Sequence, residues 1–470
     1  MSSPKIIQGG MGVGVSGYRL ARTVAMLGQR GTVSGVALER LMTRVLQKGD
    51  PNGDIRRALS HFPFSEIAEK IIAMYFVEGG IPQGKSYKAM PFFSVEPSRN
   101  LINLVVTANF VWVWLAKEGH SNPISINYLE KVSMPHIYAV TGAMLAGVDY
   151  VTMGAGIPLA IPKVLDDIAS GREASYRVPV DGTDITSYLM RFDPAKFFGR
   201  ELPRMKRPGF IPIIASNMLA NIFMKKLPAG SVQGFVIEEP TAGGHNAPPR
   251  KLILNDFNEP LPIYGEKDVV DLEALSKLGV PFWIGGSYAS PEKLKWVLSV
   301  GAEGIQAGSI FALSNDSDMN AEIRRRTRKL GFEGKLIVRT DMRISPTGFP
   351  FKVIVLDDTI AIPEIYEARE RVCSQGGLIV LYERPDGKIG YRCPSEPEAM
   401  YVAKGGDLAD TVGRGCLCNG LMANADLGDS TEDIVATLGD DVSFLPFLMK
   451  DKNDSYSASD AIGYLRGNLP

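Results

Sequence analysis

The feature that most constrains the fold is a regular alternation of short apolar runs with amphipathic stretches. Uninterrupted apolar runs are typical of strands buried on both faces, as in parallel sheets. Eight such runs, most of them followed by a helical pattern, occupy 5–10, 31–38, 123–129, 148–156, 209–216, 232–240, 280–286 and 303–309. Eight consecutive β/α units predict an α/β fold, a (β/α)8 TIM barrel.

Helix signals follow two of these runs closely. After the first run, Leu20 and Val24 fall at helical spacing. After the seventh, Ser290 can cap a helix whose first residue is Pro291, and Gly301 suits the position just past its end. These signals predict outer helices of the barrel.

The chain is longer than a minimal barrel. We expect a barrel domain over 1–330, with a helical insertion at about 40–120 and a last barrel helix near 319–330. The remaining 331–470 predict a C-terminal extension packed on the barrel. The apolar stretch 104–116 is too short to span a bilayer and is interrupted by Asn109, so it predicts a buried helix. The basic run 324–329 predicts a solvated helix face.

Charge excludes some functions. Fifty-one basic and fifty-two acidic residues leave a net charge of -1, which gives no reason to expect nucleic acid or a membrane surface as partner. The first residues lack the basic and apolar regions of a signal peptide, so we expect a cytoplasmic protein acting on a small-molecule substrate. The sequence leaves the oligomeric state open, a homo-oligomer included.

All four cysteines lie late in the chain, at 373, 393, 416 and 418. Their spacing lacks the tight pairs typical of zinc sites, so buried or paired thiols are favoured over a metal site and no metal ligand is assigned. Because all four thiols fall in one segment, we expect them to lie close together.

Two glycine patterns compete as phosphate sites. Residues 12–17, GVGVSG, with Glu39 further on, form the fingerprint of a Rossmann dinucleotide site, but the residues QGGM at 8–11 separate it from the expected strand. The second pattern is IGGS at 284–287 and AGS at 307–309. In barrels the tips after strands seven and eight commonly hold a phosphate, so Gly285, Gly286, Gly308 and Ser309 are the preferred site.

A histidine stands at the end of the sixth run. The sequence VIEEPTAGGHNAPP, 236–249, ends a strand in Glu238 and Glu239 and then presents His245 behind Gly243 and Gly244. Glycines allow a close approach of the backbone and positive φ angles. With its ordinary pKa of about 6.5, imidazole can exchange a proton at neutral pH. We predict that His245 is catalytic and that His61, His120 and His136 are structural.

These motifs together resemble the nitronate monooxygenase family (2-nitropropane dioxygenases), FMN-binding barrels related to the FMN-type enoyl-acyl carrier protein reductases. The resemblance lies in IIQGGMG at 6–12, SINYL at 125–129, AGGH at 242–245, IGGS and IQAGS. Two positions depart from the family pattern: Thr241 stands where an acidic residue is usual, and Ser309 replaces a threonine. The resemblance covers about 1–350, broken by the insertion.

The resemblance implies FMN as cofactor. The residues expected to hold it are Gln8, Gly9, Gly10, Met11, Asn127, Glu238, Gly243, Gly244, Gly285, Gly286, Gln306, Gly308 and Ser309. Gln8 and Asn127 would hold the flavin ring. The two glycine tips would hold the phosphate.

The resemblance also implies an activity. A flavin-dependent oxidoreductase is expected, a nitronate monooxygenase that oxidises an alkyl nitronate with O2 to a carbonyl compound and nitrite. Two alternatives remain: an NAD(P)H-dependent enoyl-thioester reductase, and a non-catalytic flavin- or partner-binding scaffold that uses the extension as its interaction surface.

Overall fold

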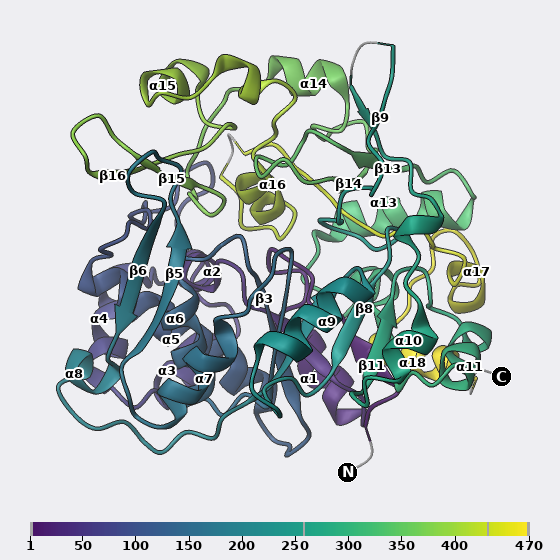
Figure 1. Ribbon diagram of the computed structural model, residues 1–470, viewed down its shortest axis with the longest axis horizontal. Helices are drawn as coiled ribbons and strands as arrows, with labels where there is room; N and C mark the ends of the chain where they lie inside the picture. Colours follow the sequence, from purple (N-terminus) through teal and green to yellow (C-terminus); the bar gives the residue numbers. More distant parts are fainter. Residues whose placement is uncertain (1–2, 257–258, 430–431, 468–470) are drawn as a thin grey trace.

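The computed structural model describes residues 3–256, 259–429 and 432–467, and its centre is a sheet of eight parallel strands (Figure 1). In spatial order they are β1 (Ile6–Gln8), β12 (Gly304–Ala307), β11 (Phe282–Gly285), β8 (Phe235–Glu238), β7 (Gly209–Ile214), β4 (Tyr150–Gly154), β3 (Ile124–Leu129) and β2 (Gly31–Ser34). All eight predicted runs are strands of this sheet. The TIM barrel is confirmed, and the alternative Rossmann interpretation of 12–17 is wrong.

The seam between β1 and β2 is closed partly by a side chain. Gln8 N–H donates to Arg30 O at 2.9 Å, and Gln8 Oε1 accepts the Thr32 N–H at 2.9 Å. The Gln8 amide also donates to Gly9 O, and the residue has no exposed surface. The oxygen and the nitrogen of the Gln8 side-chain amide therefore both form hydrogen bonds inside the barrel wall.

Apolar side chains fill the amino-terminal part of the barrel. Ile7, Ile211, Val236 and Trp283 form a separate buried cluster. Near it the Arg30 guanidinium lies 3.9 Å from the ring centroid of Tyr150 and 4.9 Å from that of Trp283. Because the barrel is packed at this end, space for a ligand is left at the carboxyl ends of the strands.

Helices surround the barrel. Those that follow its strands include α1 (Tyr18–Met26), α6 (His136–Leu145), α7 (Ile161–Ala169), α9 (Asn217–Lys226), α10 (Leu272–Ser276) and α11 (Pro291–Ser299). The start of α11 confirms the sequence signals: Ser290 Oγ accepts the Lys293 N–H at 3.2 Å, and Pro291 is the first helical residue.

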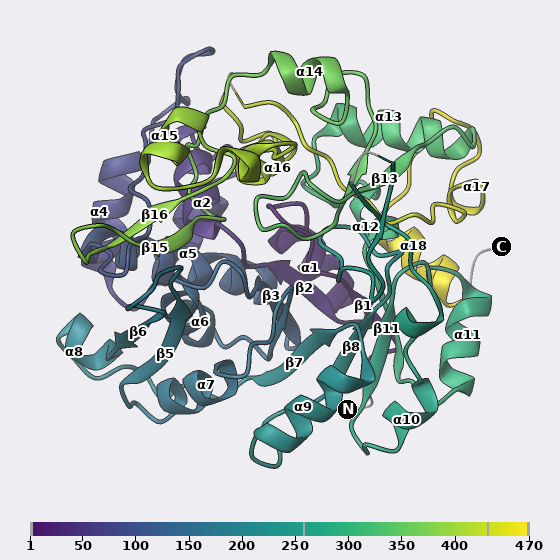
Figure 2. The same cartoon turned by 45° about the horizontal axis from the view of Figure 1, so that its top comes forward.

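The helix between α11 and α1 comes from the extension. α18 (Ala458–Leu465) packs against α1, α11 and the short α12 (Ser309–Ala312), and lies beside α11 in Figure 2. The helix expected at 319–330 exists as α13 (Ala321–Phe332), but it packs against α17 (Leu445–Leu448). Its basic run is only partly solvated, because Arg328 is buried and donates to Leu313 O.

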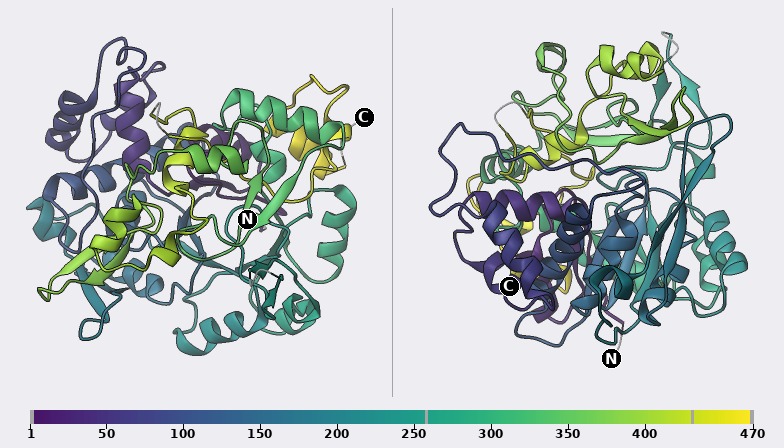
Figure 3. Two further views of the ribbon diagram at one scale, coloured as in Figure 1. Left: turned by 90° about the horizontal axis from the view of Figure 1, so that it is seen from above. Right: turned by 90° about the vertical axis from the view of Figure 1, so that its left-hand side faces the viewer.

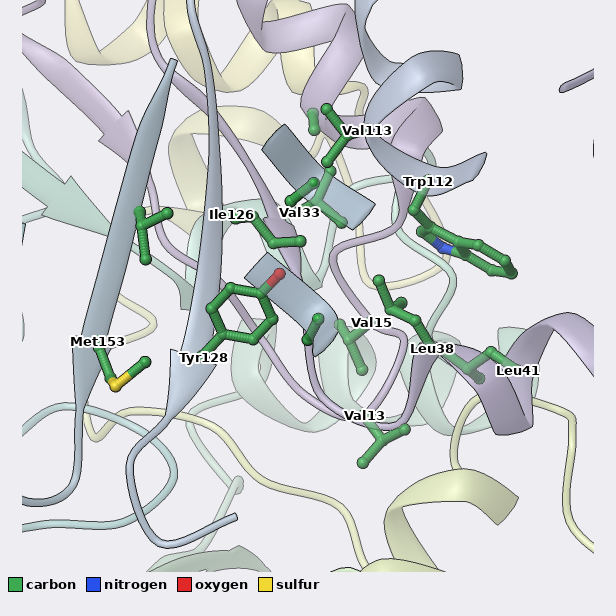
Figure 4. Packing of buried hydrophobic residues seen from close by; sticks show 14 of the residues in the cluster. Val13, Val15, Val33, Leu38, Leu41, Trp112, Val113, Ile126, Tyr128 and Met153 are labelled. Atoms are coloured by element: carbon green, nitrogen blue, oxygen red, sulfur yellow. The ribbon is translucent and has the colours of Figure 1, made fainter. Parts of the chain in front are cut away.

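The insertion after β2 is helical, as predicted. Its helices are α2 (Leu38–Gln47), α3 (Asp54–Leu59), α4 (Ser65–Tyr75) and α5 (Arg99–Lys117). Val113 of α5 packs toward Val33 and Ile126 of the barrel (Figure 4). Within the described ranges α5 is the one helix long and apolar enough for a membrane span, and 78% of that stretch is buried in the protein.

The extension and one hairpin lie over the carboxyl ends of the strands (Figure 3). The hairpin, β5 (Ala174–Pro179) and β6 (Ser187–Phe192), meets the extension through an Asp181–Tyr382 bridge. The extension contains β13 (Val338–Asp341), β14 (Phe351–Ile354), α14 (Pro363–Ala368), β15 (Val380–Glu383), β16 (Ile389–Arg392), α15 (Glu398–Ala403) and α16 (Leu417–Ala423). The boundary at 330 stays a prediction.

Candidate active site

A cavity of about 630 Å3 lies between the barrel and the extension. Pockets of roughly 300–1,000 Å3 suit cofactors and drug-sized ligands. Twelve of the thirteen residues expected at the cofactor, all except Gln8, line it, and so does His245. The extension lines the opposite wall with 375–381, 417–418, 421–422, 437–439 and Asp441. The motifs are far apart in sequence, yet they face one cavity.

The tips of β11 and β12 form one end of the cavity. Gly286 has φ +105°, and a Cβ there would lie 2.8 Å from Thr241 Oγ1. Ser309 Oγ accepts the Gly439 N–H at 3.0 Å, which leaves its own hydrogen free to donate. Thr241 Oγ1 is buried and has no hydrogen-bond partner within the described part of the chain. This end offers hydroxyl groups and uncovered backbone to a polar ligand.

The tips of β1 and β3 pack closely beside it. A Cβ on Gly10 would overlap Asn127 Cβ, so only glycine fits there. Asn127 Nδ2 lies 3.4 Å from Gly10 O, and Asn127 Oδ1 accepts the Thr152 hydroxyl at 3.0 Å. Asn127 therefore faces the cavity in a fixed orientation, whereas Gln8 points into the barrel wall.

The glycines before His245 accommodate the protein's own backbone. A Cβ on Gly243 would lie 2.8 Å from Leu438 C in the extension. Gly244 has φ +80° and donates its N–H to Thr437 Oγ1 at 2.8 Å. The close approach inferred from the sequence therefore exists at Gly243, but its partner is the 437–439 segment.

His245 is held by the extension. Its Nε2 lies 2.7 Å from Ser345 Oγ, and its ring stands edge-on to Phe351 with centroids 4.9 Å apart. Burial, and then the charge of Lys131, lower the pKa of His245 to about 3. The imidazole is therefore neutral at neutral pH, and the ordinary pKa assumed from the sequence does not apply.

Lys131 and Glu238 face the same cavity. Lys131 follows β3 and Glu238 ends β8. Burial lowers the pKa of Lys131 to about 7, against the attraction of Glu130 and Glu238. Burial raises the pKa of Glu238 to about 7, against the attraction of Lys131. The sequence analysis missed Lys131, although its place directly after a barrel strand was a usable signal.

The other three histidines have structural contacts. His136 is buried, its Nε2 lies 3.0 Å from Leu129 O, and burial lowers its pKa to about 4. His120 Nε2 lies 2.8 Å from Ala116 O, and His61 stacks on Trp114 at 4.4 Å. None of the three lines the cavity.

The four cysteines are free thiols, and they lie near one another as expected, since Cys373 acts on the pKa of the other three. Their sulfurs accept backbone N–H groups, Cys373 from Gly376 and Cys418 from Gly377 and Leu378. Burial raises the pKa of all four thiols. Within 3–256, 259–429 and 432–467, no group of three or more His, Cys, Asp or Glu side chains is arranged to hold a metal ion.

Comparison with known proteins gives only distant similarities. No family model and no curated protein matches the chain. Nitroalkane oxidase from Streptomyces ansochromogenes superposes with a TM-score of 0.45 at 12% identity, covering 99% of this chain and 95% of that one. FabK from Thermotoga maritima gives 0.39 at 16% identity, covering 78% and 76%. The enoyl reductase domain of MlnA from Bacillus amyloliquefaciens gives 0.37 at 10%, covering 78% and 68%.

Proposed function

We propose that the cavity binds FMN and that the protein is a flavin-dependent oxidoreductase. The observation that carries the proposal is the convergence of five separate motifs on one cavity. The segments 9–11, 242–245, 285–287 and 306–309, together with Asn127, all line it. The sequence resemblance names these segments as flavin contacts, and their meeting at the carboxyl ends of barrel strands is where such enzymes bind their ligands.

The residues present fit FMN. The tips at Gly285–Gly286 and Gly308–Ser309 would take the phosphate, with the Ser309 hydroxyl as a donor. Thr241 Oγ1 and Gln375 Oε1, both buried without a hydrogen-bond partner among the described residues, would meet polar groups of the ligand. Asn127 would contact the flavin ring. The chemistry that FMN supplies is two-electron exchange with a substrate.

The specific activity we propose is nitronate monooxygenation, in which an alkyl nitronate and O2 give a carbonyl compound and nitrite. His245 is neutral and fixed by Ser345, so it would orient the substrate through a hydrogen bond. The residues 375–381 of the extension would cover the substrate and exclude water.

One observation favours a second candidate, reduction of an enoyl thioester with NAD(P)H. Such a reduction ends with delivery of a proton to carbon, which nitronate oxidation does not need. Lys131 and Glu238, with pKa values of about 7, hold an exchangeable proton at neutral pH. A pair with this property suits an acid catalyst.

Two measurements test the proposal. Mass spectrometry of the ligand released from the purified protein should find FMN, and recovery of FAD or of no flavin would count against it. An anaerobic titration should bleach the flavin absorbance with a nitronate. Bleaching by NADH or NADPH in its place would favour the enoyl reductase, and a protein without flavin would favour the scaffold role.

A further inference from the structure

Lys131 is the cationic side chain of the cavity whose charged group forms no hydrogen bond among the described residues. Two cationic side chains line the cavity in the described part of the chain. Arg40 donates to Met90 O and Pro91 O and pairs with Glu39 at 3.8 Å. Lys131 Nζ, in contrast, is shielded from solvent without a hydrogen-bond partner among the described residues. Its three N–H donors are therefore available to a ligand.

An aromatic ring holds the amine in place. Lys131 Nζ lies 3.0 Å from the ring centroid of Phe349, which belongs to the extension and also lines the cavity. A ring face stabilises an ammonium group only in part, because it accepts no strong hydrogen bond. An anionic oxygen of a ligand bound in the cavity would accept hydrogen bonds from this amine.

The groups around Lys131 leave room for an anion. Glu130, Glu238 and His245 are the titratable groups whose charges couple to Lys131. His245 is neutral, and Glu130 packs against Gly156. Glu238 forms no salt bridge in the described ranges, and with its pKa raised to about 7 it too can be neutral near pH 7. When Glu238 is protonated, Glu130 is the carboxyl group whose charge still acts on the Lys131 ammonium, and it forms no hydrogen bond to Nζ among the described residues.

We propose that the Lys131 ammonium binds the negatively charged oxygen of the substrate. This rests on the proposed function, since it takes the reacting substrate to be a resonance-stabilised oxyanion. A nitronate carries this charge when it binds, whereas an enoyl thioester develops it as an enolate during reduction. Lys131 would thus contact the same oxygen in either reaction.

Anion binding at Lys131 is coupled to proton uptake. An anion favours the protonated amine and the protonated carboxyl, so binding near neutral pH takes up protons. Affinity therefore falls as pH rises through about 7, where both groups titrate.

Calorimetry with nitrite as the anion tests this without turnover. Nitrite is titrated into flavin-loaded and flavin-free protein between about pH 6 and about pH 9 in two buffers of different ionisation enthalpy. We expect Lys131→Met to bind nitrite at least about tenfold more weakly and to lose the proton uptake. Lys131→Arg should lose less affinity than the native protein as pH rises, because arginine stays charged. The exposed Lys295→Met is the control. Native affinity in Lys131→Met would overturn the proposal.

A second readout reports on the amine itself. Reductive methylation near neutral pH, followed by peptide mass spectrometry, should modify Lys131 in Phe349→Ala before the exposed Lys295. Equal or slower modification of Lys131 would contradict the proposal. Neither readout requires FMN, so a failure of FMN binding would sink the proposed function while leaving these results interpretable. Substrates then separate the two oxyanions: Lys131→Met should weaken anaerobic binding of ethyl nitronate, whereas with crotonyl-coenzyme A it should lower the reduction rate and spare binding.

Discussion

His245 Nε2 lies 2.7 Å from Ser345 Oγ, one hundred residues further along the chain. Ser345 Oγ in turn lies 2.7 Å from Thr347 Oγ1, so a short chain of hydroxyl groups from the extension fixes the imidazole. The barrel supplies the histidine, and the extension decides how it is oriented. A catalytic role for His245 therefore depends on both parts of the protein.

Replacing His245 by alanine should lower kcat by about 10²–10⁴ while FMN stays bound. The residue is half-buried at a loop tip, and the expected phosphate and ring contacts come from other residues. Flavin absorbance and kcat of the purified variant check this. Full activity with flavin bound would make His245 a bystander. Ser345→Ala, which keeps the imidazole but removes its partner, should show a smaller loss.

The pH–rate profile should show no ionisation of His245 in the neutral range. Its pKa of about 3 in the folded protein lies below the ordinary 6.5, so the unfolded chain binds the extra proton between these values. Stability contributed by neutral His245 is therefore lost as pH falls through this window. A neutral-range ionisation of kcat/KM should survive in His245→Gln and shift in Lys131→Met, where Glu238 loses the attraction of Lys131 that lowers its pKa.

Gly308→Val should abolish FMN binding without unfolding the protein. The nearest atom to a Cβ at Gly308 is Met11 Sδ at 3.7 Å, so the new side chain meets open cavity where the phosphate is expected. Gly265→Val, also in open space but outside the cavity, is the matched control. Flavin content and circular dichroism check the pair. Normal flavin content in Gly308→Val would refute the phosphate assignment.

Gln8→Leu should lower the free energy of unfolding by about 1–3 kcal/mol, because it leaves the buried Thr32 N–H without an acceptor. FMN affinity should change little, since Gln8 does not line the cavity. Gln306 lies on the neighbouring strand and lines the cavity, so Gln306→Leu should lower FMN affinity and change the free energy of unfolding little. Denaturant unfolding and flavin titration of both variants distinguish the roles.

Lys131 and Glu238 should lower the free energy of unfolding most near neutral pH. The raised pKa of Glu238 makes the fold lose stability as pH rises from 4.5 to about 7. The lowered pKa of Lys131 makes it regain stability from about 7 to 10.5. The double variant Lys131→Met/Glu238→Gln should therefore exceed the native Tm by the largest margin near pH 7. A margin independent of pH would contradict this.

The four thiols should react slowly with Ellman's reagent in the native protein and rapidly in guanidinium chloride. Burial raises the pKa of Cys418 to about 11, so only about 10⁻³ of it is thiolate at pH 8. Cys418 lines the cavity, and FMN should slow its reaction further. Rapid reaction of all four thiols in the native protein would contradict this prediction, because it would show that they are accessible to the reagent.

Features set by local sequence could be predicted. The eight strands follow from uninterrupted apolar runs, and the start of α11 follows from Ser290 and Pro291. The tip after β11 was visible from its glycines, and Gly286 is required there because its φ is +105°.

Features set by distant contacts could not be predicted. The pKa of His245 depends on its burial beneath the extension. The sequence of 236–249 contains no information about which distant residues bury it. Gln8 belongs to a flavin motif by sequence, but its side chain completes the wall at the β1–β2 seam. Lys131 could have been suspected from its position, yet its lack of a partner became visible only in three dimensions.

The placement of α18 has a consequence for synthesis on the ribosome. This helix packs against α1 and α11, so the surface that it contacts on these two helices is covered only after residues 458–465 have been made. A nascent chain that already contains all eight strands still exposes that surface, and surfaces of this kind attract chaperones or promote aggregation. The barrel and the extension should therefore mature together, late in translation, as one folding unit.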